Sequence, residues 1–272
     1  MAAAAQRHHR SGQRVGFVPT MGALHEGHAA LIRTARRECD IVVVSIFVNP
    51  LQFGPKEDYG RYPRRLPADL RLCRAAGADV VFTPSVREIY PNGFATQVRV
   101  RGVTARWEGA HRPDHFDGVT TVVATLFNLV QPDRAYFGQK DYQQVLVIRQ
   151  MTRDLGWPID IRMRPTIRER DGLALSSRNA YLTPPQRREA PALHQMLHAG
   201  RRMILRGERN ASRLARQMRA HLAGTAFTLQ YLAIVDADTL EPVVRARGKT
   251  AFLVAARLGG TRLIDNILVE VP

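Results

Sequence analysis

The chain has 272 residues, 45% hydrophobic and 24% charged, and these ordinary globular values exclude disorder, collagen-like repeats and coiled coils. Its formal net charge is +16. Lys56, Lys140 and Lys249 are the lysines among 40 basic residues, which leaves 37 arginines, scattered along predicted helices. We interpret this charge as a solvated basic surface that attracts small anions, and we expect no nucleic-acid partner.

Residues 41–48 form the longest apolar run, far below the roughly 20 residues of a membrane-spanning helix. Residues 1–12 lack the apolar stretch of a secretory signal. We therefore expect a cytoplasmic protein without membrane contact and with a frayed start at residues 1–12.

Short apolar segments alternate with helical patterns through the first 163 residues. Strands are predicted at residues 15–18, 41–48, 78–83, 134–137 and 159–163. Helices are predicted at residues 29–37, 69–76, 119–130 and 142–155, with Gly77 and Gly156 as stops. Residues 41–48 (IVVVSIFV) are apolar on both faces, which is typical of a central parallel strand. The pattern predicts an α/β domain with a doubly wound parallel sheet.

The pattern changes after about residue 166. Helices are predicted at residues 184–206 and 211–223, and strands at residues 229–235, 250–256 and 267–271. Helices followed by strands indicate a smaller α+β domain. We therefore expect domains at residues 1–166 and 167–272.

Cys39 and Cys73 are the two cysteines. They cannot build a disulfide framework, and neither lies in a Cys-x-x-Cys spacing. We predict two buried free thiols without a catalytic role.

Residues 19–28 (PTMGALHEGH) directly follow the first predicted strand, where α/β sheets bind ligands. Gly22 and Gly27 allow close backbone approach, and the spacing of His25 and His28 puts both rings on one face of the next helix. The N–H groups at a helix start favour anions, so we predict a phosphate site. Two helix-capping histidines, or a metal pair lacking an evident third ligand, are the alternatives.

Residues 45–54 (SIFVNPLQFG) end the second predicted strand in an Asn-Pro turn. Asn49 and Gln52 are expected on the same rim as the histidines. Their amides offer donors and acceptors suited to hydroxyl and carboxylate groups. The alternative is a simple turn.

Two further segments carry polar groups. In residues 136–144 (YFGQKDYQQ), Lys140 can neutralise phosphate and Asp141 can accept a ribose hydroxyl; an exposed Lys–Asp pair is the alternative. In residues 167–179, Ser176 and Ser177 beside Arg178 form a clamp for a triphosphate. A helix cap at Ser177 or Asn179 is compatible with that clamp.

His25-Glu26-Gly27-His28 resembles the His-x-Gly-His element of the nucleotidyltransferase superfamily, which includes class I aminoacyl-tRNA synthetases. Together with residues 108–123, 131–133 and 255–266, the four segments resemble the pantothenate synthetase (pantoate–β-alanine ligase) family over nearly the whole chain after Val15. The resemblance implies a Rossmann-like N-terminal domain, a smaller C-terminal lid and a homodimer.

The activity that the resemblance implies is the ATP-dependent condensation of (R)-pantoate with β-alanine through pantoyl adenylate, releasing AMP and pyrophosphate. ATP is a substrate that carries Mg²⁺, without protein metal ligands or a tightly bound organic cofactor. The implied catalytic residues are His28 as proton donor, His25, Lys140 and Arg178. We interpret His28 as a hydrogen-bond donor more than a general acid, because pyrophosphate hardly needs a proton to leave.

The resemblance also implies ligand contacts. Pantoate is expected at Gln52 and Gln144, and β-alanine at Gln52. ATP is expected at Met21, Gly22, Ala23, Leu24, His25, Glu26, Gly27, His28, Gly138, Gln139, Lys140, Asp141, Ile167, Leu175, Ser176, Ser177 and Arg178. The chain departs from the family pattern at Gln139 (usually Glu), Thr125 (often Lys) and Arg65 (commonly Thr), which affects local contacts and not the reaction.

The same residues suggest two alternative functions. An adenylyltransferase of the same superfamily would use a phosphorylated acceptor, for which the neutral amides Asn49 and Gln52 are poor ligands. An RNA-binding protein would match the charge, but the sequence offers no aromatic-rich platform.

Overall fold

The computed structural model describes Met1, residues 7–55 and residues 57–271. Of the predicted frayed start, residues 2–6 lie outside the described residues and residues 7–10 are helical. The chain divides into two compact units, Met1–Gln139 with Gln143–Pro165, and Lys140–Tyr142 with Thr166–Pro272. The functional domains at residues 1–166 and 167–272 stay a prediction. Among the described residues, no helix has the length and apolar character needed to cross a bilayer.

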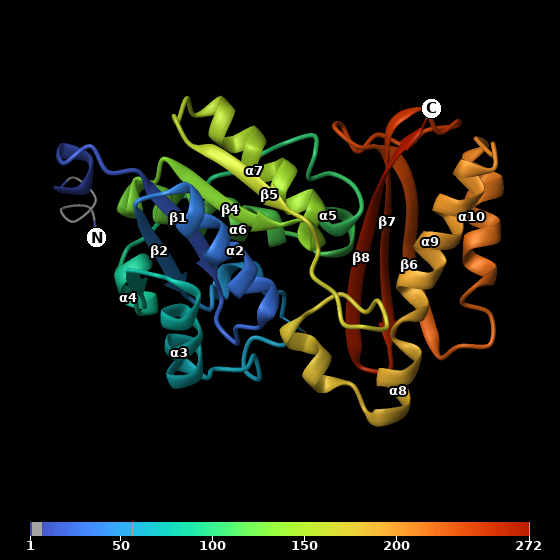
Figure 1. Ribbon diagram of the computed structural model, residues 1–272, viewed down its shortest axis with the longest axis horizontal. Coiled ribbons are helices and arrows are strands. Elements are labelled where there is room, and N and C mark those ends of the chain that lie inside the picture. Colours follow the sequence, from blue (N-terminus) through green and yellow to red (C-terminus); the bar gives the residue numbers. More distant parts are fainter. Residues whose placement is uncertain (2–6, 56, 272) are drawn as a thin grey trace. The chain divides into compact units, whose positions relative to one another are not determined.

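The first unit is built on a parallel sheet of five strands in the order β3-β2-β1-β4-β5 (Figure 1). The strands are β1 (Val15–Thr20), β2 (Ile41–Ile46), β3 (Val80–Phe82), β4 (Arg134–Gly138) and β5 (Asp160–Arg164). The strand order reverses between β1 and β4, the position at which open α/β sheets bind ligands. The predicted doubly wound, Rossmann-like sheet is confirmed.

Helices cover both faces of this sheet. The longer ones are α2 (Glu26–Glu38), α3 (Leu66–Ala76), α6 (His115–Val130) and α7 (Tyr142–Asp154). Successive strand residues enter different cores: Phe17 packs with residues of α6 and α7, and Val18 with residues of α2 and α3. Cys39 and Cys73 are buried free thiols in the second of these cores, as predicted. The short elements are the helices α4 (Val86–Ile89) and α5 (Glu108–His111) and the 3-10 turns η1 (Pro50–Gln52) and η2 (Gln139–Asp141).

Three helices begin earlier than the sequence pattern predicted, among them α6, which starts at His115 rather than at residue 119. Helix α2 starts at Glu26, three residues before the predicted start, because His25 caps it. Helix α3 starts at Leu66 with Pro67 in its first turn. Proline is tolerated there because the backbone N–H groups of a first turn have no intrahelical acceptor. Gly77 ends α3 with a left-handed φ of 96°, as predicted.

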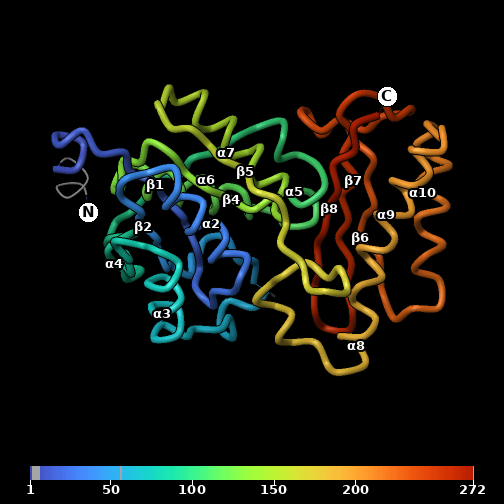
Figure 2. Tube along the Cα trace, viewed as in Figure 1, coloured from blue at the N-terminus to red at the C-terminus, as the bar shows by residue number. Residues whose placement is uncertain are grey.

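The second unit contains an antiparallel sheet in the order β6-β7-β8, which can be followed in Figure 2. Its strands are β6 (Phe227–Asp236), β7 (Gly248–Leu258) and β8 (Thr261–Val271). Its helical elements are η3 (Ser177–Tyr181), α8 (Pro184–Glu189), α9 (Ala192–Leu205) and α10 (Ala211–Ala220). A Cβ at Gly200 of α9 would lie 2.5 Å from the sulfur of Met218 in α10 and 2.8 Å from the ring of Phe252, so these side chains pack directly against the glycine. The predicted smaller α+β unit is confirmed.

Two boundaries predicted for this unit were wrong. The single helix expected at residues 184–206 is two helices, α8 and α9, because Pro191 lacks the N–H that a continuous helix requires. Strand β8 begins at Thr261 rather than at residue 267. It pairs back on β7 across a tight turn at Gly259, whose φ is 58°.

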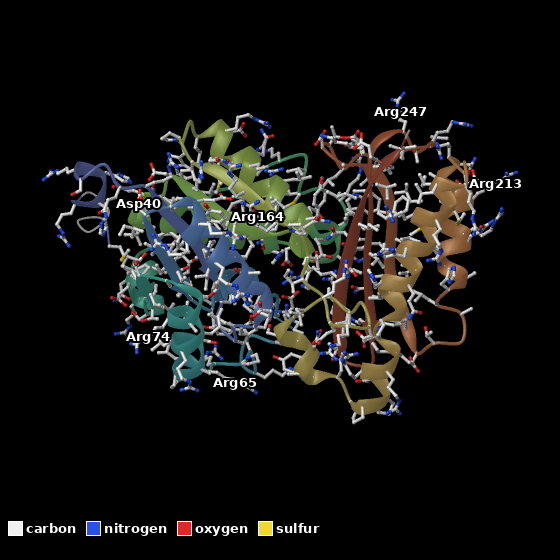
Figure 3. The ribbon with its side chains drawn as sticks, viewed as in Figure 1. Asp40, Arg65, Arg74, Arg164, Arg213 and Arg247 are labelled. Atoms are coloured by element: carbon white, nitrogen blue, oxygen red, sulfur yellow. The ribbon has the colours of Figure 1, made fainter. Side chains whose placement is uncertain are left out.

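Arginine side chains are distributed over elements of both units (Figure 3). Arg65 and Arg74 belong to the start and the last turn of α3, Arg164 ends β5, and Arg213 lies on α10. Arg164 forms an ion pair with Glu38. The basic residues therefore do not come from one element.

Candidate active site

The loop that follows β1 is held by a buried carboxylate from α3. Asp69, which is 3% exposed, accepts hydrogen bonds from the backbone N–H groups of Ala23 (3.0 Å) and Leu24 (2.8 Å). Gly22 has a φ of 81°, and a Cβ there would lie 3.0 Å from the carboxylate. Glycine is therefore required for the close approach of this loop to Asp69. No pattern in the sequence had indicated a role for Asp69.

His25 and His28 lie together at the start of α2, with ring centroids 4.1 Å apart. Nδ1 of His25 accepts from the Gly27 N–H at 3.2 Å, and Nδ1 of His28 accepts from the His25 N–H at 3.3 Å. The helix-capping interpretation is thus confirmed. Because both Nδ1 atoms accept, a neutral ring carries its proton on Nε2. The caps therefore fix each imidazole as an Nε2–H donor, which is compatible with binding an anion.

Asn49, which follows β2 and caps η1, is 1% exposed, and its side chain is hydrogen-bonded within the protein. Its Nδ2 donates to the Gly118 carbonyl (3.0 Å) and to Oε1 of Gln52 (3.1 Å), while its Oδ1 accepts from the Tyr90 hydroxyl (2.7 Å). A ligand therefore cannot approach Asn49 without displacing these bonds. Of the two amides on this rim, Gln52 is the better candidate for ligand contact, and Asn49 orients it.

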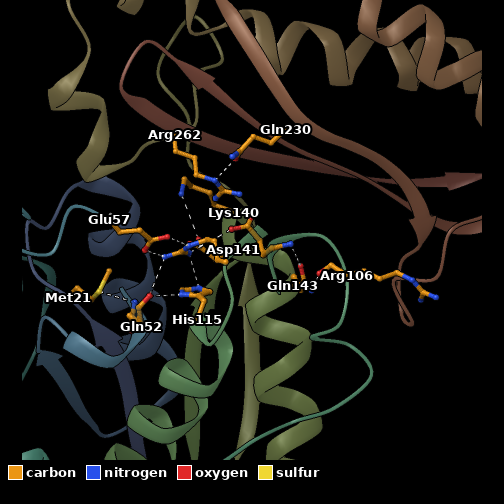
Figure 4. A network of polar contacts seen from close by, with 12 residues as sticks. Met21, Gln52, Glu57, Arg106, His115, Lys140, Asp141, Gln143, Gln230 and Arg262 are labelled. Carbon is orange, nitrogen blue, oxygen red and sulfur yellow. Dashed lines mark hydrogen bonds and ion pairs between the residues drawn. The ribbon is translucent and has the colours of Figure 1, made fainter. Parts of the chain in front are cut away.

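Gln52 joins the first two predicted segments. Its Nε2 donates to the sulfur of Met21 at 3.1 Å, and its backbone carbonyl pairs with the His115 ring. Both interactions are drawn as dashed lines in Figure 4. The residues after β1 and those after β2 are thus in contact, as expected for neighbouring parallel strands. Strand β4 is the other neighbour of β1, so Gly138 ends at the same sheet edge.

The residues after β4 divide between the two units. Gln139 belongs to the first unit and Lys140 to the second, and Gln144 lies half-buried in the first turn of α7. Lys140 Nζ lies 3.9 Å from Asp141 Oδ1, with side chains 20% and 48% exposed. Of this pair, the Asp141 side chain is exposed, as the alternative interpretation expected, but the Lys140 side chain is mostly buried. The backbone carbonyl of Lys140 accepts a hydrogen bond from Asn266 Nδ2 at 2.9 Å.

The predicted phosphate loop of the second unit is closed by its own backbone. The Leu175 N–H donates to the Ile167 carbonyl at 3.0 Å, so two of the predicted ATP contacts pair at its base. Ser176 caps the following turn by accepting from the Arg178 N–H at 3.3 Å. The cap predicted at Ser177 or Asn179 was wrong, because the turn already begins at Ser177.

A buried ion pair lies beside this loop, and no role was predicted for it. Arg168 donates Nη1 to Asp265 Oδ2 (2.6 Å) and Nη2 to Asp265 Oδ1 (2.9 Å). The Asp265 side chain is only 3% exposed. This bidentate geometry fixes the start of the loop to strand β8.

The three departures from the family pattern lie apart from the histidines in sequence. Thr125 donates its hydroxyl to the Thr121 carbonyl one turn earlier in α6. Arg65 is the exposed residue before α3, and Gln139 opens η2. Of the predicted catalytic residues, His25 and His28 lie together in the first unit, and Lys140 and Arg178 belong to the second.

The pantoate–β-alanine ligase family model matches residues 1–268. A pantothenate synthetase of Moorella thermoacetica is 56% identical over 272 residues, which is 100% of this chain and 95% of that protein. A crystal structure of pantothenate synthetase from Thermus thermophilus has a TM-score of 0.92 at 55% identity, covering 95% of this chain and 93% of the other. A pantoate–β-alanine ligase of Francisella tularensis, solved with beta-gamma ATP and β-alanine, has a TM-score of 0.77 at 36% identity, covering 97% and 95%. The chain belongs to the pantoate–β-alanine ligase family.

Proposed function

We propose that this chain is an AMP-forming ligase that condenses (R)-pantoate with β-alanine, using ATP, to give pantothenate. The family membership supports this activity, as does the Francisella relative solved with a nucleotide and β-alanine. The observation in the structure that carries the proposal is the arrangement at the sheet edge. Two imidazoles, fixed as Nε2–H donors at a helix start, follow β1, and the Gln52 amide that follows β2 contacts the same loop at Met21.

ATP contacts, in this proposal, the loop and helix start at residues 21–28, residues 138–141, Ile167 and residues 175–178. The N-terminus of α2 suits phosphate because its N–H groups and dipole favour negative charge. His25 and His28 donate from Nε2 to the phosphates. Lys140 and Arg178 add positive charge, the arginine with a planar fork that matches phosphate oxygens.

Pantoate and β-alanine are proposed to use the neutral amides. Because Oε1 of Gln52 accepts from Asn49 and one Nε2–H donates to Met21, the ligand meets the second N–H of the Gln52 amide. That donor suits the hydroxyl and carboxylate oxygens of pantoate. Gln144 is proposed as the second pantoate contact, and Gln52 also borders β-alanine.

Mg²⁺ is proposed to arrive with ATP. Among the residues that the structure describes, no group of three or more His, Cys, Asp or Glu has the geometry of a metal site. We therefore propose that the ion is held mainly by phosphate oxygens and water, as Mg²⁺ often is. When bound, the ion reduces the charge of the triphosphate.

The reaction runs in two steps. A pantoate carboxylate oxygen attacks the α-phosphorus, the bond to the bridging oxygen breaks, and pyrophosphate leaves with its electron pair. Lys140, Arg178, His25 and His28 offset the repulsion between the two anions and the charge that develops. The amine of β-alanine then attacks the acyl carbon of pantoyl adenylate, AMP leaves, and the amine loses a proton. Closure of the C-terminal unit as a lid would exclude water that could hydrolyse the adenylate.

AMP formation tests this function. Purified protein with Mg-ATP should release AMP only when pantoate and β-alanine are both present. An adenylyltransferase would instead yield an adenylate-containing product without any need for β-alanine. Tight RNA binding that weakens steeply with salt, without AMP release, would favour the RNA-binding alternative.

The homodimer is proposed from the family resemblance, and a cytoplasmic location is proposed separately. Sedimentation equilibrium of the purified chain tests the first, since a dimer has twice the mass of 30.5 kDa. Cell fractionation tests the second.

A further inference from the structure

The short segment that contains Gln52 is held from a distant part of the chain. The backbone carbonyl of Gln52 accepts from Nδ1 of His115 at 2.9 Å and from Nη2 of Arg112 at 3.4 Å. The same guanidinium pairs with Glu57, Nε to Oε1 and Nη2 to Oε2, both at 2.6 Å. Residues 52 and 57 are therefore tied to the Arg112–His115 segment at two points.

The surroundings of His115 decide its tautomer. Nη1 of Arg112 lies 2.9 Å from Nε2 of His115, and a guanidinium can only donate, so Nε2 must accept. The ring proton is then on Nδ1, the atom that faces the Gln52 carbonyl. Burial, followed by the nearby Arg112 charge, lowers the pKa of His115 to about 4, whereas Glu57 and Glu108 favour the protonated ring to a smaller extent. His115 is thus a neutral Nδ1–H donor near neutral pH.

The side chain of Gln52 is oriented by a second set of bonds. The Tyr90 hydroxyl donates to Asn49 Oδ1, which leaves Asn49 Nδ2 to donate to Gln52 Oε1. A Cβ at Gly118 of α6 would lie 2.2 Å from the Leu51 carbonyl oxygen, so α6 packs directly against the backbone of η1. The amide direction of Gln52 therefore depends on the backbone position that His115 holds.

We propose that His115, aligned by Arg112, is a positioning residue that holds the Gln52 backbone so that its Nε2–H₂ group faces pantoate. This inference rests on the proposed pantoate contact of Gln52. His115 itself donates to protein and not to the ligand, so its loss should affect pantoate binding more than ATP binding.

Two amide variants separate donation from side-chain size. In His115→Asn, the amide nitrogen can occupy the place of Nδ1 and still donate to the Gln52 carbonyl. In His115→Gln, the amide reaches toward the place of Nε2 and leaves that carbonyl without its donor. We expect the Gln variant to raise the pantoate KM about tenfold, the effect of one lost hydrogen bond, with the ATP KM within about twofold of wild type. The Asn variant should recover most of the pantoate affinity.

Hydrogen exchange of residues 50–57 provides a readout that does not depend on activity. Exchange there should accelerate in His115→Gln and stay slow in His115→Asn, with thermal unfolding of both variants recorded to verify folding. Equal pantoate KM and equal exchange in the two variants would overturn the positioning role. In a Gln52→Ala background, His115→Gln should raise the pantoate KM no further, and a full additional tenfold rise would also overturn it.

The same experiment separates this inference from the proposed site. An unchanged pantoate KM in Gln52→Ala would refute the contact between Gln52 and pantoate. Exchange of residues 50–57 in the two His115 variants would then still decide whether His115 holds this backbone.

Discussion

Nδ1 of His28 accepts a hydrogen bond from the backbone N–H of His25, 3.3 Å away, while the His25 ring accepts from the Gly27 N–H. The two imidazoles form a reciprocal cap of α2. The cap is therefore compatible with the catalytic role proposed for these two histidines. The cap determines which nitrogen of each ring is protonated, and that nitrogen is the donor that phosphate chemistry requires.

Replacement of His28 tests this donor. His28→Ala should slow single-turnover formation of pantoyl adenylate by about a hundredfold or more, the usual effect of removing one well-placed donor, about 3 kcal/mol. His28→Gln is the matched control, because its Nε2 amide can donate from a similar position, and it should recover part of the rate. A near-normal rate in His28→Ala, with folding verified by circular dichroism, would contradict the assignment.

Replacement of Asp69 tests the support of the loop after β1. In Asp69→Asn one amide NH₂ group must face a backbone N–H, so a charge-assisted bond to Ala23 or Leu24 is lost. We expect a loss of about 2 kcal/mol in unfolding free energy and a higher KM for ATP. Urea unfolding and ATP titrations measure these effects. Asp154→Asn, at the exposed end of α7, is the control and should change neither quantity.

Breaking the Arg168–Asp265 pair should destabilise the protein far more than breaking an exposed ion pair. Asp265→Asn leaves the largely buried Arg168 uncompensated and should cost about 3 kcal/mol or more. Asp171→Asn breaks the 2.6 Å pair with Arg187, whose side chains are 41% and 35% exposed, and should cost at most about 1 kcal/mol. Equal losses of Tm in the two variants would show that burial of the pair does not matter.

His115 should make stability depend on pH in the acid range. The pKa of His115 is about 4 in the folded protein, against about 6.5 in an unfolded chain. Below pH 6.5 the unfolded chain therefore binds a proton that the folded protein does not bind until about pH 4. Wild type should lose up to about 3 kcal/mol relative to His115→Asn as the pH falls across this window. Parallel urea titrations at pH 7 and pH 4.5 measure the difference, and parallel curves would contradict it.

The sequence predicted much of the fold because its signals are local. Apolar runs such as residues 41–48 and the stop at Gly77 depend on neighbours within a few residues, so strands and helix ends could be located without the tertiary structure. Boundaries were missed where a cap or a proline decided them, as at His25 and Pro191. The ordered motifs also identified the family, which the comparisons confirmed.

Only the tertiary structure decided which groups support the candidate ligand residues. Asp69 reaches Leu24 across 45 residues, and His115 reaches Gln52 across 63, so no local pattern reveals either bond. The protonated nitrogens of His25, His28 and His115 were likewise undecided by sequence, because a tautomer depends on which donors face the ring. Residue type and spacing thus determined which chemical groups this chain offers to a ligand. The packing of distant segments decided which way these groups point and which ring nitrogen of each histidine carries the proton.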